Sequence, residues 1–247
     1  VRANKLRSVL TILGVVIGIA SVIAVVAITD GLDRYMADKG LALGTKSFTV
    51  QKFPDIVVSF EQFREFNKRK DLVLRDIDLV KEACTYCSEV GGLFVTGRTV
   101  KYGSLRHEGA QIMGITENYA RIGAIRDLLT GRHLINDDID SARPVAVIGT
   151  DVVDTLFPNA EPLGKEIIID GNRLRVVGVG ERKGKVFGQS QDNFVWTPIT
   201  AFRKAFGSRR SVTIQVEAQS MALFEQAQDQ ARLALRRPLA REAERLE

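Results

Sequence analysis

Two cysteines in the motif Cys84-Thr-Tyr-Cys87 are the residues best suited to chemistry in this sequence of 247 residues. Such a pair can form a redox centre, supply two ligands to zinc, form a local disulfide or remain as two thiols. Zinc needs two further ligands, and His107 and His133 lack the matching spacing. A redox pair normally lies at a helix start, whereas this pair falls near the end of an expected helix. A disulfide, two unlinked thiols and a redox pair remain open, and an oxidising compartment would permit the disulfide.

The other motifs that could carry chemistry each lack a part that their chemistry requires. A glycine-rich loop follows an expected strand at residues 178–184, GVGERKG, but no helix follows it to hold a pyrophosphate. No G-x-x-x-x-G-K-[ST] loop and no G-x-S-x-G motif is present. Asp137, Asp138 and Asp140 lack the ordered spacing and the glycine of a calcium loop, so we expect a solvated loop. We therefore predict no catalytic, cofactor-binding or metal-binding residue, and no enzyme activity for this chain alone.

The first element that could position the rest is an uncharged apolar run at residues 9–28, VLTILGVVIGIASVIAVVAI. As a helix it would be about 30 Å long, close to the thickness of the hydrocarbon core of a bilayer. A helix of a soluble domain presents a polar face to water, whereas every face here is apolar. The alternatives are a signal peptide, whose apolar region is usually shorter, and a buried core helix. Length and absence of charge favour a transmembrane helix with a stalk, together spanning residues 1–40.

The charges on either side of this span predict its orientation. Arg2, Lys5 and Arg7 precede it, and Asp30 and Asp33 follow it. By the positive-inside rule the N-terminus is cytoplasmic and the bulk of the chain is extracytoplasmic, which in a Gram-negative cell means periplasmic. The net charge is only +5, and charges of both signs are interspersed elsewhere, so we expect no nucleic-acid partner.

Small residues in the span could let a second helix approach it closely. Gly14 and Gly18 form a G-x-x-x-G pair, and Ser21 lies close to the same helix face. Glycine is also simply common in membrane helices, so helix packing and an incidental pair both remain open.

The remainder of the sequence predicts a mixed α/β domain, so the fold class is α+β. Strands are expected at residues 47–53, 92–101, 109–115, 143–149, 165–170, 173–180, 193–197 and 211–217. Helices are expected at residues 59–69, 75–86, 150–157, 198–206 and 219–236.

Local signals mark several boundaries of these elements. Ser59 begins a capping box, and the residues Asp170-Gly171-Asn172 predict a hairpin turn. Thr150 is suited to cap the short helix that follows it. Thr197 followed by Pro198 predicts a helix cap and the first helical position.

Several segments together resemble the MacB-like permeases, which belong to the FtsX-like group of ABC transporters. The opening ANKLRSVLTILGVVIGIASVIAVVAITDG resembles their first membrane helix. The likeness continues through LGTKSFTV (43–50), the Gly131-Arg132 turn with Asp138, RPVAVIGTDVVDTLF (143–157), PLGKEIIIDGNRLRVVGVGERKG (162–184) and WTPITAFRKAFG (196–207). It covers nearly the whole chain, and its motifs are specific together although each is weak.

The resemblance implies a permease with four membrane helices and a large periplasmic domain between the first two. By this likeness, residues 41–105 and 205–238 form a porter-like subdomain, residues 106–204 form an inserted strand-rich subdomain, and residues 239–247 are a tail. It also implies a bacterial inner-membrane location, a lipid bilayer around the helices, a cytoplasmic ABC ATPase, a second permease copy in a dimer, and a periplasmic adaptor or cargo protein. ATP-driven motion would be relayed to the periplasmic domain for export or extraction of a substrate, with no cofactor on this chain.

Other functions remain as alternatives, because the further membrane helices and the ATPase of that family are missing from this sequence. We therefore expect a truncation or an excerpt of a longer permease. The main alternative is a single-pass membrane-anchored periplasmic binding or sensory domain. An anchored thiol oxidoreductase using Cys84 and Cys87 is a third hypothesis.

Overall fold

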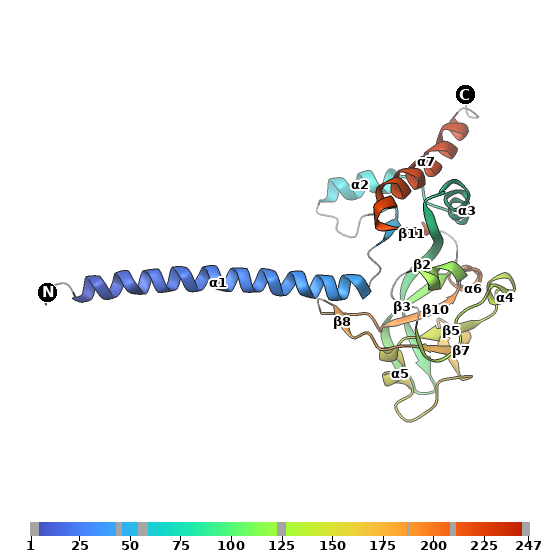
Figure 1. The fold of residues 1–247 in the computed structure, drawn as a ribbon. Helices are drawn as coiled ribbons and strands as arrows, with labels where there is room; N and C mark the ends of the chain where they lie inside the picture. The colour runs from blue at the N-terminus through green and yellow to red at the C-terminus, as the bar shows by residue number, and fades with distance from the viewer. Residues whose placement is uncertain are drawn as a thin grey trace. The chain divides into compact units, whose positions relative to one another are not determined.

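The computed structural model describes residues 5–42, 46–53, 59–122, 127–186, 188–207 and 211–243 (Figure 1). The chain divides into two compact units, Val1–Thr45 and Lys46–Glu247. The first unit contains one long helix, α1 (Lys5–Ala42), and the second contains all the other elements. This arrangement confirms the expected N-terminal apolar helix followed by a mixed α/β domain.

The second unit alternates short strands with short helices. Its strands are β1 (Ser47–Val50), β2 (Cys87–Tyr102), β3 (Leu105–Ile115), β4 (Leu128–Gly131), β5 (Val145–Ile148), β6 (Glu166–Ile169), β7 (Asn172–Gly180), β8 (Lys185–Val186), β9 (Gln189–Ser190), β10 (Phe194–Pro198) and β11 (Thr213–Ala218). Its α-helices are α2 (Phe60–Lys68), α3 (Leu74–Ala83), α4 (Asn136–Asp140), α5 (Thr150–Leu156), α6 (Ile199–Phe206) and α7 (Phe224–Ala243). Short 3₁₀ turns lie at Glu117–Arg121 and Met221–Leu223.

Six strands of the large sheet close into a small barrel. Around the ring, β2 pairs with β3, β3 with β10, β10 with β5, β5 with β7, β7 with β6, and β6 with β2 again. Strand β4 pairs with the end of β7, and β8 and β9 form a separate hairpin. Closure of the ring satisfies the backbone of strands that would otherwise present open edges.

Strand β2 connects this barrel to the rest of the unit. Its residues 87–93 pair with β11, whereas its residues 93–102 pair with β3. Strand β11 also pairs with β1, and Figure 1 shows α2, α3 and α7 at one end of the unit and α5 at the other. Strand β2 thus pairs both with β11 and with the barrel, and residues 46–247 form one compact unit. The expected division into a porter-like subdomain and an inserted subdomain stays a prediction.

The main hydrophobic core fills the barrel and continues beneath α3 and α7. Helix α3 buries Ile77 and Val80, which lie on one face at helical spacing. The fully buried residues that the barrel contributes include Val100, Ala110, Ile112, Ala146, Ile148, Ile167, Ile169 and Val195. A second, smaller cluster surrounds Trp196 and Phe194 on the other face of β10.

Two local sequence signals are confirmed. Asp170 and Gly171 form the two-residue turn between β6 and β7, with φ angles of 48° and 83°. Positive φ at both positions is what a tight hairpin turn of this kind requires. The Ser59 hydroxyl accepts a hydrogen bond from the N–H of Gln62 at 3.2 Å and so caps α2.

Two expected caps are each wrong by one residue. Gly149, and not Thr150, is the N-cap of α5, and its backbone lies so close to β10 that a Cβ would fall 2.0 Å from the Asp192 carbonyl oxygen. Likewise β10 continues through Pro198, which is the N-cap of α6. The Thr197 hydroxyl instead donates to the carbonyl oxygen of Val145 at 3.0 Å. Contacts between strands therefore outweigh the local capping preference.

Two helices also run beyond their expected ends. Helix α1 continues to Ala42, past the end of the expected stalk at residue 40. Helix α7 begins at Phe224, after a 3₁₀ turn, and continues to Ala243. Residues 239–243, which we expected in the tail, are therefore helical, and residues 244–247 lie outside the described residues.

The aspartate cluster is only partly the solvated loop that we expected. The side chain of Asp138 is 0% exposed and accepts bonds from Arg132 Nη1 at 2.6 Å, Arg132 Nη2 at 3.1 Å and the Ile135 N–H at 3.2 Å. Burial by itself raises the pKa of Asp138, but the bonds from Arg132 and Ile135 and the charges of Arg132 and Arg143 outweigh it and hold the pKa below 3.8. Asp138 therefore ties the turn after β4 to α4.

We expect Asp138→Asn to lower the free energy of unfolding by about 2 kcal/mol, because it removes a charged acceptor from a buried pair. Urea unfolding of the detergent-solubilised chain, followed by the fluorescence of Trp196, measures this. Because the folded-state pKa is depressed, the stabilisation is complete above pH 3.8 and is lost as the pH falls through the lower folded-state pKa. The difference from wild type should therefore shrink only in that acidic range.

Asp137→Asn is the matched control, since the Asp137 side chain is 57% exposed and pairs with Arg143 on the surface. Its effect should stay below about 0.5 kcal/mol. Equal losses of stability in the two variants would contradict the special role of the buried carboxylate.

Candidate functional site

Helix α1 carries the segment that can span a membrane. Among the described residues it is the one helix long and apolar enough, at Ile12–Gly31, where the mean hydropathy is 2.8. The described side chains of this segment are exposed, which is unfavourable in water and favourable in hydrocarbon. This segment overlaps the uncharged apolar stretch from which we expected a membrane span at residues 9–28 and reaches three residues beyond it.

The basic residues before the span and the small residues within it belong to the N-terminal part of the chain, most of them to α1. Arg2 lies outside the described residues, and Lys5 and Arg7 fall in the first turns of α1. Among the described residues, and apart from the neighbouring backbone of α1 itself, no atom lies within 4 Å of a Cβ built at Gly14 or Gly18. The Ser21 hydroxyl on the same face donates to the carbonyl oxygen of Gly18 at 2.8 Å, as a hydroxyl surrounded by lipid must do.

The first strand of the second unit lies beside the strand that precedes its last helix. Strand β1, the first element after α1, pairs with β11, the strand that leads into α7. The Ala218 N–H donates to the Lys46 carbonyl oxygen at 2.8 Å, and the Lys46 ammonium lies 3.0 Å from the Glu217 carboxylate. Phe48 meets Phe224, the first residue of α7, edge to face with ring centres 5.6 Å apart. The start of the unit and the start of its last helix are therefore fixed to each other.

The Cys84–Cys87 motif forms the corner between α3 and β2. The structure links the two sulfur atoms in a disulfide, with the Cα atoms 5.4 Å apart. Cys84 is buried, and its Sγ lies 3.8 Å from the carbonyl oxygen of Ala227 in α7. The disulfide corner, residues 84–87, is thus packed directly against the last helix.

Two glutamines hold this corner against α7. Gln230 Oε1 accepts hydrogen bonds from the N–H groups of Thr85 at 2.9 Å and Tyr86 at 3.3 Å. Gln219 Nε2 donates to the Thr85 carbonyl oxygen at 2.8 Å, and the Gln219 N–H donates to the Tyr86 carbonyl oxygen at 2.9 Å. Sequence reasoning missed both glutamines, because contacts across more than a hundred residues leave no local pattern.

The position of the disulfide corner favours a structural role over redox chemistry. Cys84 is the C-cap of α3, where the negative end of the helix dipole disfavours a thiolate. Reactive C-x-x-C pairs lie instead at helix N-termini, where the dipole stabilises the thiolate. Both backbone carbonyl groups and both N–H groups of the intervening turn are also bonded to α7 or to its approach. This bonding holds the corner in place against α7.

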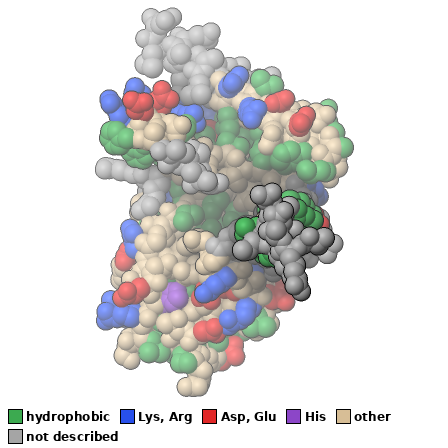
Figure 2. Space-filling model, turned by 90° about the vertical axis from the view of Figure 1, so that its left-hand side faces the viewer, with side chains coloured by type: hydrophobic (Ala, Val, Ile, Leu, Met, Phe, Trp, Pro, Cys, Tyr) green, Lys and Arg blue, Asp and Glu red, His purple; other side chains and the backbone are tan. Residues whose placement is uncertain are grey.

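Other groups that the sequence offered for chemistry do not form a catalytic or metal site among the described residues. His107 Nδ1 lies 2.9 Å from Thr155 Oγ1, and its Nε2 lies 2.8 Å from Asn193 Oδ1. Within the described ranges, no group of three or more His, Cys, Asp or Glu side chains is placed to hold a metal ion. The loop after Gly180 is followed by the short strand β8, so the helix that a dinucleotide needs is missing there. On the face shown in Figure 2, basic and acidic side chains are interspersed.

Comparison with known proteins places this fold. The profile of the MacB-like periplasmic core domain family matches residues 8–234. The macrolide export ATP-binding/permease protein MacB of Neisseria gonorrhoeae is 31% identical over 203 residues, which are 81% of this chain and 30% of that protein. MacB 2 of Yersinia pestis bv. Antiqua is 32% identical over 219 residues, which are 87% of this chain and 31% of that protein. The chain thus spans about a third of the length of these relatives.

Two solved structures share the fold at low sequence identity. The periplasmic region of MacB from Actinobacillus actinomycetemcomitans superposes with a TM-score of 0.60 at 22% identity, covering 75% of this chain and 82% of that one. The extracellular domain of the noncanonic ABC-type transporter YknZ from Gram-positive bacteria gives a TM-score of 0.61 at 21% identity, covering 76% of this chain and 92% of that one.

We expect the double substitution Cys84→Ser/Cys87→Ser to lower the free energy of unfolding by about 2 kcal/mol, the loop-closure value for a four-residue loop. Urea unfolding followed by Trp196 fluorescence under non-oxidising and oxidising conditions measures this. A reductant should bring the wild type to the stability of the variant and leave the variant unchanged. A variant as stable as the oxidised wild type would show that the bond contributes nothing.

Proposed function

This chain belongs to the MacB-like periplasmic core domain family, and from that premise we propose that it is the first membrane helix and the periplasmic domain of an ABC transporter permease. The family domain is not itself catalytic, and together with the apolar helix it fits an inner-membrane protein. In the proposed role, the chain relays ATP-driven motion to the periplasm for export or extraction of a substrate.

The observation that carries this proposal is the joining of β1 to β11 and α7. Helix α1 runs without a break from Lys5 to Ala42, about 57 Å, and only residues 43–46 separate it from β1. The Lys46–Glu217 ion pair and the Phe48–Phe224 contact then fix β1 beside the start of α7. A movement of α1 therefore has a short route into the sheet and into the last helix, as hinge or shear coupling needs.

The remaining parts of the transporter follow from the same proposal. The basic residues Arg2, Lys5 and Arg7 favour a cytoplasmic N-terminus, with Lys46–Glu247 in the periplasm. A cytoplasmic ABC ATPase, on another chain or domain, supplies the energy. A second permease copy completes a dimer, and an adaptor or cargo protein meets the periplasmic unit.

We expect a short run of glycines inserted between Leu32 and Leu41 to uncouple ATP hydrolysis from transport in the complete transporter. Glycine in a helix interior costs about 1 kcal/mol per residue, so the insertion breaks the stiff rod between the membrane and β1. Transport should fall roughly tenfold or more while ATP hydrolysis persists, measured together in proteoliposomes.

The control for this experiment is the same insertion between Asn159 and Ala160, in the exposed turn between α5 and β6. It should leave both transport and hydrolysis unchanged. Unchanged transport in the α1 insertion would refute the relay, whereas loss of both activities would point to misassembly and is recognised by the membrane level of the protein.

We also propose that the Gly14, Gly18 and Ser21 face packs against another membrane helix, because no described residue outside α1 comes close to a Cβ built at either glycine. Gly14→Leu/Gly18→Leu should weaken helix association on the order of tenfold, since the larger side chains keep the backbones apart. Energy transfer between labelled chains in lipid vesicles measures the association.

Ala20→Leu/Ala27→Leu is the matched control, because both alanines lie on the opposite side of α1. It adds the same kind of bulk and should leave association nearly unchanged. Equal effects of the two double substitutions would argue against a specific packing face.

A further inference from the structure

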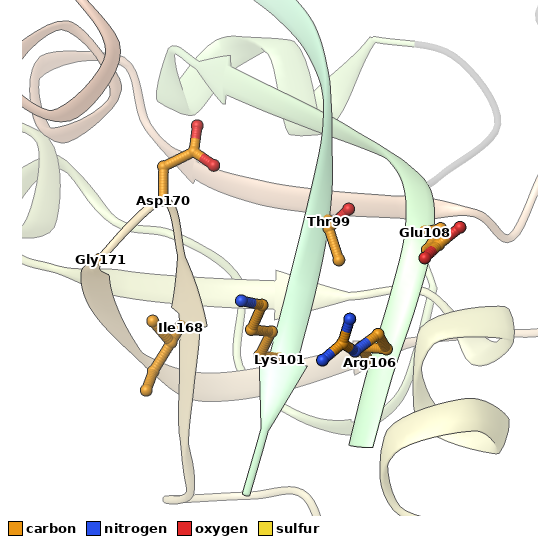
Figure 3. Close-up of a pocket in the computed structure, with 7 residues that line it drawn as sticks. All are labelled: Thr99, Lys101, Arg106, Glu108, Ile168, Asp170 and Gly171. Atoms are coloured by element: carbon orange, nitrogen blue, oxygen red, sulfur yellow. The ribbon is translucent and has the colours of Figure 1, made fainter. Parts of the chain in front are cut away.

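A polar hollow lies on the outer face of the barrel, where β2 ends and β3 begins. It has a volume of about 330 Å³ and is lined by three neighbouring strands, β6, β2 and β3, and by the β6–β7 turn (Figure 3). This volume lies at the lower end of the range for small-ligand sites. We call it the β2–β3 hollow.

The strand register places two cations opposite each other on the floor of this hollow. Lys101 of β2 pairs with Arg106 of β3 on one side and with Ile168 of β6 on the other. The three side chains therefore form a row across one face of the sheet, and Figure 3 shows Lys101 and Arg106 over that face. Like charges that face each other across strands destabilise a sheet.

The protein provides little internal compensation for this pair. The Asp170 carboxylate at the edge of the hollow is engaged by Arg98, with Nε and Oδ2 2.6 Å apart. In the part of the chain that the structure describes, no ion pair joins Lys101 or Arg106 to a carboxylate. Glu108, the other acid of the hollow, makes no ion pair among the same residues. The hollow thus offers two cations and one carboxylate to an incoming group.

The backbone beneath these charges is held in place by buried neighbours. The residues next to this row along β2 and β6, Val100 and Ile169, point into the barrel and are fully buried. Tyr102 packs on Phe157 of the α5 end, with ring centres 4.4 Å apart. A β-bulge between Arg98 and Val100 bends β2 beside the hollow. This backbone therefore fixes the separation of the two strand positions, while the Lys101 and Arg106 side chains themselves are exposed and accessible to a ligand.

We propose that the β2–β3 hollow binds a carboxylate group between Lys101 and Arg106. The Arg106 guanidinium can donate two parallel hydrogen bonds to a carboxylate, and Lys101 adds a second positive charge. Glu108 on the same face repels a dianion and accepts a hydrogen bond from a hydroxyl or amino group beside the bound carboxylate. The ligand is therefore a small amino or hydroxy acid, or an acidic side chain of a polypeptide. This inference does not rest on the proposed transport role.

Calorimetric titration of the full chain in detergent tests the proposal with three probes: glutamate, a tripeptide with a central glutamate and blocked termini, and inorganic phosphate. We expect saturable binding of a carboxylate, with phosphate roughly tenfold weaker. Binding of glutamate alone identifies a free acid as the source, and binding of the tripeptide identifies an acidic side chain. No saturable binding of either carboxylate at millimolar concentration, or tighter binding of phosphate, overturns the proposal.

The substitution Lys101→Glu separates binding from folding. It replaces the repelling pair with a Glu–Arg pair, so the urea midpoint should rise while carboxylate binding falls roughly tenfold or more. Lys81→Glu, in α3 at the other end of the unit, makes the same charge change outside the hollow and should leave binding unchanged. Unchanged binding in Lys101→Glu, equal loss in Lys81→Glu, or a lowered midpoint in Lys101→Glu contradicts the proposal.

Discussion

Strand β2 is the element on which the second unit depends, because its two halves pair with different neighbours. The first half is bonded to β11, and through β11 to β1 and α7. The second half closes the barrel by pairing with both β3 and β6. A strand that is bonded and packed along its whole length deforms little, so its two ends are mechanically linked. Cys87 lies at one end of β2 and Lys101 near the other.

The disulfide corner gives α7 its attachment to this strand. The corner offers α7 a backbone turn whose N–H and carbonyl groups are bonded by Gln230 and Gln219, and a sulfur atom beside Ala227. Strand β1 pairs with β11, which in turn pairs with β2. The first strand of the unit and the start of α7 are therefore both attached to β2.

Two pairs of charged residues in the second unit differ in burial and in the sign of their interaction. The buried Asp138 carboxylate accepts bonds from the partly exposed Arg132 and from the Ile135 N–H, which tie the turn after β4 to α4. Lys101 and Arg106 face each other at the surface, where they add nothing to stability. The first pair is explained by the folded chain itself. For the second pair, we propose an anion from outside as the partner.

The sequence by itself determined the elements that depend on consecutive residues. The apolar span within α1, the Ser59 cap and the Asp170–Gly171 turn follow from hydropathy and backbone preference, which act over a few positions. The family resemblance likewise rested on runs of neighbouring residues. Only the tertiary structure decided that Gly149 and not Thr150 caps α5, that β6 closes the barrel on β2, and that Gln230 bonds the disulfide corner. These features join segments tens to more than a hundred residues apart, and their register depends on how the whole core packs, which no local pattern encodes.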